Sequence, residues 1–232
     1  MKDSLVISEK FYSIQGEGAT MGIPSVFIRL AGCNLLCKSD SWVCDSIEVW
    51  QKGIKTKFED VLDNDQYYAI LDGAHLIFTG GEPLLHQKKI VDFVNWFIAN
   101  HKFRPFIEVE TNGTIVPSKQ MCEIVSQWNC SPKLQNSGEP FVRRVVIPAL
   151  RELNNQDSTI FKFVVSSEGD IFDILADYGD DIDHSKIVLM PAGETQEKLN
   201  ITRPIVIEQC LKTGFKYSDR LHIVIWNQKT GV

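Results

Sequence analysis

Short runs of apolar, β-branched and aromatic residues recur along the chain, and a polar turn follows most of them. The runs lie at 25–32, 75–81, 106–113, 161–167, 186–193 and 221–226, with an earlier one at 5–13. Between them, apolar residues at helical spacing predict helices over 84–102, 118–128, 170–179 and 194–214. This alternation predicts βαβ units in a parallel sheet, and right-handed crossovers place the helices outside it.

The number of predicted strands limits the possible architectures. Six main strands and one early strand are too few for a complete eight-stranded barrel. We therefore predict an α/β fold, a partial (β/α)6-type barrel with parallel strands and helices outside. No internal repeat, low-complexity tract or linker divides the 232 residues, so we expect a single domain over 1–232.

The most distinctive residues directly follow predicted strands. Cys33 follows the first main strand, and the segments GGEP (80–83), TNG (111–113) and PAG (191–193) come at the ends of later ones. The carboxyl ends of parallel strands meet at one edge of a sheet, where folds of this class carry their sites. The sequence therefore predicts a functional site at this rim.

Composition and charge exclude several classes of protein. The chain is 44% apolar and 23% charged, as in ordinary globular proteins. Its first ten residues lack a signal-peptide core, and no run approaches the ~18 apolar residues of a membrane span. We expect a cytoplasmic protein that contacts no membrane, with reduced thiols. A net charge of −6 argues against bulk nucleic-acid binding.

Three cysteines, Cys33, Cys37 and Cys44, lie close together in a loop over 33–46. Thiolates are soft ligands that suit zinc, copper(I) or iron–sulfur clusters. A structural zinc site closes with four protein ligands, whereas three thiolates leave one position open. These cysteines could hold three irons of a 4Fe-4S cluster and leave the fourth iron for a small molecule. A zinc site with a distant fourth ligand, or cysteines without a metal, stays open on these residues alone.

The cysteine spacing, CxxxCxxxxxxC, resembles the CxxxCxxC signature of the radical S-adenosylmethionine (SAM) superfamily, with four extra residues before the third cysteine. The segments TGGEP (79–83), SPK (131–133) and MPAG (190–193) resemble the SAM-contacting segments of that superfamily, in the same order. The resemblance implies a 4Fe-4S cluster that binds SAM. It implies SAM contacts from Gly80, Gly81, Glu82, Ser131, Pro132, Lys133, Met190, Pro191, Ala192 and Gly193.

Two further segments, SIQGEG (13–18) and RLHIVIW (220–226), resemble the 7-carboxy-7-deazaguanine synthase family. The resemblance implies conversion of 6-carboxy-5,6,7,8-tetrahydropterin to 7-carboxy-7-deazaguanine with loss of ammonia, in queuosine-type biosynthesis. It implies substrate contacts from Ile14, Gln15, Gly16, Glu17, Arg29, Thr79, His222 and the terminal carboxylate of Val232.

The same resemblance implies further components of the reaction. Ser46 stands where the family has a threonine that ligates Mg²⁺, and it keeps the hydroxyl group. A homodimer and an electron donor such as flavodoxin or ferredoxin are also implied. No residue is assigned as a general acid or base.

The residues themselves support part of this assignment. Arg29 lies in an otherwise apolar strand, where a guanidinium must be paired. Its neighbours Ile28 and Leu30 point to the opposite face. Its partner is either a substrate carboxylate or one of Glu108 and Glu110, which share one strand face.

Other interpretations stay open from the sequence. His222, in a predicted apolar strand, is by itself more typical of a hydrogen-bonded core histidine than of a catalytic one. The whole chain could instead be a glycyl-radical-enzyme activase of the same superfamily, or a non-enzymatic zinc-binding module. SIQGEG and RLHIVIW favour the synthase over the activase.

Overall fold

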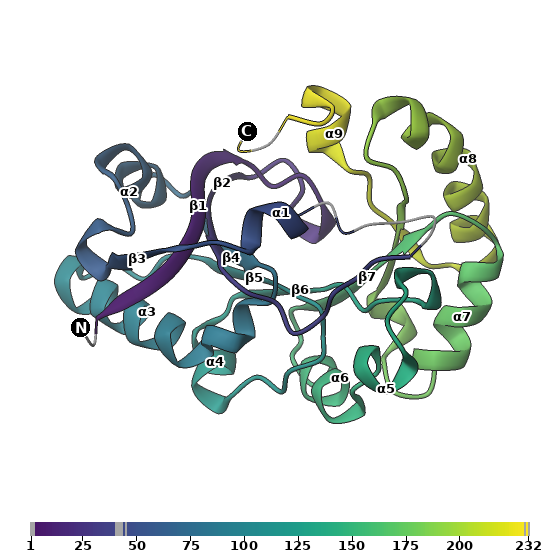
Figure 1. Ribbon diagram of the computed structural model, residues 1–232, viewed down its shortest axis with the longest axis horizontal. Helices are drawn as coiled ribbons and strands as arrows, with labels where there is room; N and C mark the ends of the chain where they lie inside the picture. The colour runs from purple at the N-terminus through teal and green to yellow at the C-terminus, as the bar shows by residue number, and fades with distance from the viewer. Residues whose placement is uncertain (1–2, 40–43, 45, 230, 232) are drawn as a thin grey trace.

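A single curved sheet forms the centre of the computed structural model, which describes residues 3–39, 44, 46–229 and 231 (Figure 1). The strand order is β3-β1-β2-β4-β5-β6-β7-β8-β9. The parallel strands are β2 (Pro24–Leu30), β4 (His75–Gly80), β5 (Ile107–Thr111), β6 (Gln127–Cys130), β7 (Thr159–Val165), β8 (Ile187–Pro191) and the short β9 (Lys216–Tyr217). The sheet is not closed, which confirms the predicted partial barrel.

The edge of the sheet departs from the prediction of parallel strands. β1 (Ser4–Ile14) confirms the early strand, but it pairs antiparallel with β2, and β3 (Ile54–Lys57) pairs antiparallel with β1. The connection between β1 and β2 is too short for a crossover helix, so the chain must turn back. This hairpin carries the segment SIQGEG to the end of β1.

The helices lie around the outside of the sheet, where α3, α4, α6, α7 and α8 surround it in Figure 1. Their bounds are α1 (Ile47–Trp50), α2 (Asn64–Leu71), α3 (Gln87–His101), α4 (Lys119–Ile124), α5 (Phe141–Arg144), α6 (Ile147–Asn154), α7 (Gly169–Tyr178), α8 (Gln196–Thr213) and α9 (Leu221–Trp226). The helices predicted over 84–102, 170–179 and 194–214 are confirmed as η3 (Pro83–His86) with α3, α7 and α8, respectively.

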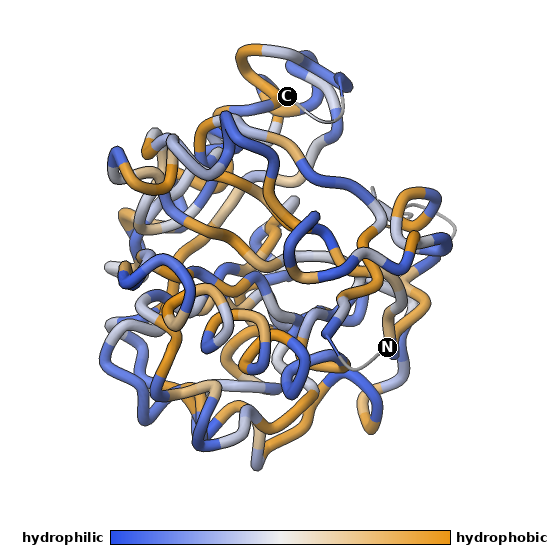
Figure 2. Tube along the Cα trace, turned by 90° about the vertical axis from the view of Figure 1, so that its left-hand side faces the viewer, coloured by the Kyte–Doolittle hydropathy of each residue, from blue (hydrophilic) through white to orange (hydrophobic). Residues whose placement is uncertain are grey.

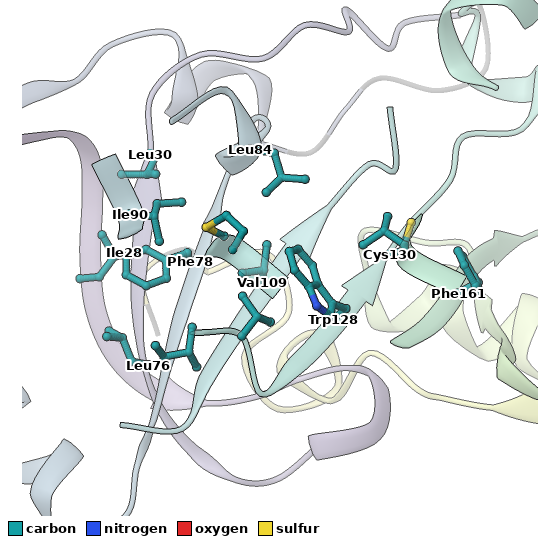
Figure 3. Close-up of a cluster of buried hydrophobic side chains, with 14 of the residues drawn as sticks. Ile28, Leu30, Leu76, Phe78, Leu84, Ile90, Val109, Trp128, Cys130 and Phe161 are labelled. Atoms are coloured by element: carbon teal, nitrogen blue, oxygen red, sulfur yellow. The ribbon is translucent and has the colours of Figure 1, made fainter. Parts of the chain in front are cut away.

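The strands separate apolar from polar residues through their alternation. Phe78, Val109, Trp128 and Phe161 are fully buried in the core cluster, together with residues of η3 and α3 (Figure 3). The intervening residues point to the opposite side. The sheet therefore packs one face against the helices and leaves the other face for the polar residues of β5, β6 and β7.

Two predicted elements are wrong. The helix predicted over 118–128 ends at Ile124, because Val125 is extended, and β6 follows at Gln127–Cys130. The strand predicted over 221–226 is the helix α9. An apolar run of this length fits either a strand or a helix, and its periodicity does not distinguish the two. Leu221 donates its N–H to the Gly16 carbonyl at 2.8 Å, which directs the chain across the end of β1.

Hydrophobic and hydrophilic segments alternate along the trace in Figure 2. Among the described residues, no helix is both long enough and apolar enough to cross a membrane.

Replacing Trp128 with alanine tests the core. Trp128 is the largest fully buried side chain, so Trp128→Ala should lower the free energy of unfolding by about 3–5 kcal/mol. Phe172→Ala is the control, since Phe172 is 68% exposed and its loss should cost no more than about 0.5 kcal/mol. Urea unfolding measures both, and equal losses would contradict this assignment of the core.

Candidate active site

The loops that follow β2 and β4 are in direct backbone contact. Glu82 donates its N–H to the Gly32 carbonyl at 3.0 Å. A Cβ on Gly81 would lie 2.4 Å from the Gly32 carbonyl oxygen and 2.5 Å from Cys33 Cβ. Only glycine fits at position 81, because the GGEP segment packs against the first residues of the cysteine loop.

The carboxylate of Glu82 links this pair of loops to the end of β5. It is fully buried and accepts hydrogen bonds from Thr111 Oγ1 at 2.9 Å, Asn112 N at 2.7 Å and Leu84 N at 2.9 Å. Burial raises the pKa of Glu82, although these hydrogen bonds counteract it. Its side chain binds the end of β5 while its backbone N–H binds the loop after β2, so Glu82 connects three loops at the rim.

Asn112 extends these contacts to the cysteine loop. Its side-chain amide donates to Asn34 Oδ1 at 3.1 Å and lies 3.9 Å from Cys33 Sγ. Ser131, after β6, donates its N–H to the Thr111 carbonyl at 2.7 Å. The ends of β2, β4 and β5 therefore meet at one rim, as the sequence predicts, and the end of β6, which the sequence does not predict as a strand, lies beside them.

The three loop cysteines influence one another electrostatically. Burial raises the pKa of Cys33 and raises that of Cys37 to about 11, and charge on Cys44 raises both further. The ammonium of Lys133 lowers both pKa values. Cys44 also donates its N–H to the Cys37 carbonyl at 3.1 Å, so these two cysteines lie side by side in the loop. Thiols with raised pKa values become thiolate ligands when a metal stabilises the negative charge.

The three thiols of the loop fit an iron–sulfur cluster by their chemistry, because thiolates are soft ligands. In an iron–sulfur cubane, each thiolate binds a different iron, so the sulfurs need not converge on one point. Cys33, Cys37 and Cys44 therefore suit three corners of a 4Fe-4S cluster.

The sheet face opposite the helices carries a cluster of polar side chains from neighbouring strands. We call Glu108 and Glu110 of β5, Asn129 of β6 and Lys162 of β7 the polar face. Asn129 Nδ2 donates to Glu108 Oε2 at 2.8 Å and to Glu110 Oε1 at 3.0 Å. Glu110 directly precedes Thr111 of the rim, so the polar face extends to the loops beside the cysteines.

Charge pairing stabilises the polar face. Lys162 Nζ lies 2.8 Å from Glu110 Oε2 and 3.0 Å from Glu17 Oε2, and its side chain is only 1% exposed. Burial alone would raise the pKa of Glu17, but Lys162, Arg220 and His222 lower it far below its ordinary 4.5. Burial also lowers the pKa of Lys162, and the two carboxylates reverse this and raise it. Glu17 and Lys162 therefore stay charged, whereas burial raises the pKa of Glu110 although Lys162 counteracts it.

Gln15 is held entirely by protein groups at this face. Its Nε2 donates to Glu110 Oε1 at 3.0 Å and to Glu108 Oε2 at 3.3 Å, while its Oε1 accepts from Glu17 N at 3.2 Å. Glu108 is itself fully buried and also accepts from Thr20 Oγ1 at 2.9 Å. The side chain of Gln15 therefore orients Glu17 and Glu110, while its backbone pairs with Gly22 and Ile23 across the turn between β1 and β2.

Arg29 has a different protein partner from those expected. Its Nε pairs with Glu9 Oε1 at 2.6 Å, so the expectation of Glu108 or Glu110 is wrong. Those two residues are engaged by other groups of the polar face. Ile28 and Leu30 are fully buried, which confirms that Arg29 points the other way, and Thr79 is its neighbour across β2 and β4.

The segment before α9 meets the end of β1. His222 lies on helix α9 rather than in a strand, and its Nε2 is 3.9 Å from Glu17 Oε1. A Cβ on Gly16 would be 2.3 Å from His222 Nδ1, so a side chain at position 16 would displace the His222 ring. Ile14 ends β1 beside this contact. Val232 lies outside the described residues.

The remaining expected contact residues lie at later strand ends. Lys133 Nζ donates to the carbonyl of Ser131 at 3.0 Å, and Pro132 between them is buried. Gly80 ends β4 with φ +156°, where a Cβ would clash with the Leu30 carbonyl. Met190 and Pro191 end β8, and Ala192 and Gly193 follow them at the same rim.

Ser46 occupies the N-cap position of α1, but its hydroxyl makes no capping hydrogen bond there. Its Oγ lies 3.5 Å from Cys44 Sγ. The hydroxyl is thus directed toward the cysteine loop rather than toward the helix.

Comparison with known proteins agrees with this geometry. A family described as a 4Fe-4S single cluster domain matches residues 14–131. A protein of Halobacterium salinarum named 7-carboxy-7-deazaguanine synthase is 34% identical over 97% of this chain and 91% of its own length. The chain belongs to the 7-carboxy-7-deazaguanine synthase family. A family member from Pyrobaculum aerophilum is 30% identical over 97% of this chain and 96% of its own.

Structural similarity supports the same family. The crystal structure of QueE from Escherichia coli matches with a TM-score of 0.67 at 25% identity, over 94% of this chain and 95% of that one. The partial barrel, including its antiparallel edge, is therefore the fold that this synthase-family chain adopts over nearly its whole length.

Several site residues of this synthase-family chain are missed by sequence analysis. Lys162 lies in an otherwise apolar strand, the same signal that singles out Arg29, and it could have been found in this way. Asn129 could not, because it directly follows the helix predicted over 118–128 and no local pattern predicts a strand there. Arg220 heads the segment RLHIVIW, but no local pattern shows that it reaches Glu17, 203 positions earlier in the chain.

Replacing Gly81 with alanine tests the contact between the GGEP segment and the cysteine loop. The added methyl group would overlap Gly32 and Cys33, so Gly81→Ala should lose most of the iron and sulfide bound after anaerobic reconstitution. Gly169→Ala is the matched control, since its nearest contact would be Ser167 Oγ at 3.5 Å. Full cluster content in Gly81→Ala would contradict the packing described here.

Replacing Glu17 with glutamine tests the charge pairing. A carboxyl whose pKa is lowered on folding stabilises the protein above its unfolded-state pKa, and this contribution is lost as the pH falls through the folded-state pKa. The stability advantage of wild type over Glu17→Gln should therefore be constant above about pH 5 and shrink below its ordinary pKa of 4.5. Urea unfolding at a series of pH values measures it.

Glu59→Gln provides the control for this experiment. Glu59 pairs with Lys57 at an exposed position, with 62% of its side chain accessible, so its loss should change stability by no more than about 1 kcal/mol at any pH. A pH-independent difference for Glu17→Gln would show that Glu17 is not held ionised by its neighbours.

Proposed function

We propose that this chain is a radical SAM enzyme, a carbon–nitrogen lyase that converts 6-carboxy-5,6,7,8-tetrahydropterin to 7-carboxy-7-deazaguanine with release of ammonia, in queuosine-type 7-deazapurine biosynthesis. One observation carries the proposal: the polar face and the three-cysteine loop meet at the same rim. Only Thr111 separates Glu110 from Asn112, and Asn112 contacts both Glu82 and Cys33. A substrate on the polar face would thus lie beside a cofactor held at the cysteine loop.

The polar face suits the pyrimidine edge of a pterin. That edge presents N–H donors beside a carbonyl acceptor. Glu17 and Glu110 are ionised or charge-paired acceptors, and Lys162 is a donor placed between them. Hydrogen bonds to charged groups are stronger than neutral ones, and they reject analogues that lack the matching groups. Ile14, Gln15 and Gly16 are proposed to contact the same edge.

Arg29 is the proposed partner of the substrate carboxylate. Glu9 contacts it through Nε, and within the described residues the two Nη groups make no hydrogen bond. A guanidinium presents paired donors that match a carboxylate. Thr79, His222 and the terminal carboxylate of Val232 are proposed to contact the same substrate.

Cys33, Cys37 and Cys44 would hold the 4Fe-4S cluster, and Ser46 would contribute a hydroxyl to Mg²⁺, whose preferred ligands are oxygens. When bound, the cluster supplies the electron for reductive cleavage of SAM, and Mg²⁺ supplies Lewis-acid charge near the substrate carboxylate. SAM is proposed to contact the rim residues of GGEP, SPK and MPAG. Glu82, which is fully buried, would act through the backbone that it positions.

The protein residues position the substrate rather than transfer protons to it. Gln15 and Glu108 are buried and orient the groups of the polar face, so that these are already arranged when substrate binds. We assign no general acid or base. A homodimer and a protein electron donor, such as flavodoxin or ferredoxin, complete the proposal by analogy with the family.

The decisive experiment is an anaerobic assay of the reconstituted protein. Cluster-loaded protein should form 7-carboxy-7-deazaguanine, detected by mass spectrometry, from SAM, the carboxypterin, Mg²⁺ and dithionite. Cys44→Ser should lose bound iron and product together. Cys210→Ser should keep both, since Cys210 lies on α8 and contacts the Lys216 carbonyl.

Other outcomes separate the parts of the proposal. Cleavage of SAM without the deazaguanine product would overturn the substrate assignment, and a modified protein partner would favour an activase. Bound zinc in place of iron and sulfide would overturn the cluster. Full activity after complete removal of Mg²⁺ would remove the role of Ser46.

A further inference from the structure

Arg220 connects two segments that are distant in the sequence. Its Nε donates to Glu17 Oε1 at 3.1 Å, and its Nη1 donates to the Gly193 carbonyl at 2.8 Å. Its side chain is 11% exposed. One guanidinium therefore bridges the segment that follows β1 and the segment that follows β8.

Neighbouring contacts fix the geometry of this bridge. Leu221 donates its N–H to the Gly16 carbonyl at 2.8 Å, and Gly18 donates its N–H to Ser218 Oγ at 2.8 Å. The segment 218–222 is thus bound to the segment 16–18 on both sides of Arg220. Arg220 adds the connection to Gly193, which these other contacts do not make.

The chemistry of arginine suits this position. A guanidinium is planar and presents donors in fixed and different directions, so it can bind a carboxylate and a carbonyl oxygen at once. The ammonium of lysine is a single point charge, and it lacks this fork. Because Glu17 is also paired with Lys162, movement at Gly193 is linked through Arg220 to the polar face.

We propose that Arg220 is a positioning residue that couples the two ligand sites, so that SAM and the pterin each bind more tightly when the other is present. The inference rests on the proposed function, which places the pterin at Glu17 and SAM at Gly193. Whichever ligand binds first holds its own segment, and Arg220 then holds the other segment in place for the second ligand. The second ligand then binds to a segment that is already held in place, so less conformational entropy is lost when it binds.

Equilibrium binding to the cluster-loaded protein tests the coupling. Without a reductant SAM is not cleaved, so its Kd can be measured by anaerobic calorimetry with and without saturating carboxypterin. Wild type should bind SAM roughly fivefold or more tightly when the pterin is present, the usual lower range of such coupling. Arg220→Gln should give nearly equal Kd values, and Arg220→Lys, which keeps the charge without the fork, should also lose most of the coupling.

Arg203→Gln is the matched control. Arg203 pairs with Asp219, the neighbour of Arg220, through Nε at 2.9 Å, and so anchors the same segment to α8. Within the part of the chain that the structure describes, it makes no hydrogen bond or ion pair with Glu17 or Gly193. Arg203→Gln should therefore keep the coupling of wild type, even where it lowers the melting temperature.

The possible results are distinguishable. Wild-type coupling in Arg220→Gln or in folded Arg220→Lys would overturn the inference, as would equal Kd values in wild type. Loss of coupling in Arg203→Gln would show that anchoring of the segment, rather than the bridge, is responsible. If Arg220→Gln does not fold, as judged by circular dichroism, Arg220→Lys decides. Failure of the pterin to bind wild type at all would instead overturn the proposed function.

Discussion

The buried ammonium of Lys162, held between the carboxylates of Glu17 and Glu110, is the interaction on which the polar face depends. Removing a charge from water costs several kcal/mol, and only close partners of opposite charge offset it. The three residues come from β7, from the segment after β1 and from β5. The charges can therefore be buried only when these segments are assembled, and this makes the polar face a product of the whole fold.

The cysteine loop depends on a different constraint, the close approach of backbones at the rim. Gly81 leaves no room for a side chain against Gly32 and Cys33, and the carboxylate of Glu82 binds the next strand end through Thr111 and Asn112. A network of buried hydrogen bonds that are all satisfied is rigid. Cys33, the first cysteine of the loop, is consequently held against a rigid part of the rim.

These two constraints meet in the final part of the chain. The segment 218–222 contacts the end of β1, while Arg220 also reaches the segment after β8. A short helix at this position is thus part of the site rather than a surface addition. Arg220 binds Glu17, which lies 203 positions earlier in the sequence, and also binds Gly193. The proposed coupling between the ligands depends on these two contacts.

The sequence by itself determined the βαβ order, five of the six long parallel strands, and the grouping of motifs at their ends, because alternation and strand-end position are local properties. Local patterns could not show that QWNC forms a strand or that LHIVIW forms a helix. They also could not show that Glu9 is the salt-bridge partner of Arg29. Those outcomes depend on contacts between distant segments, and an apolar run or a lone arginine is compatible with several partners. The tertiary structure alone decided them, since burial of charge selects the partner that assembly brings within reach.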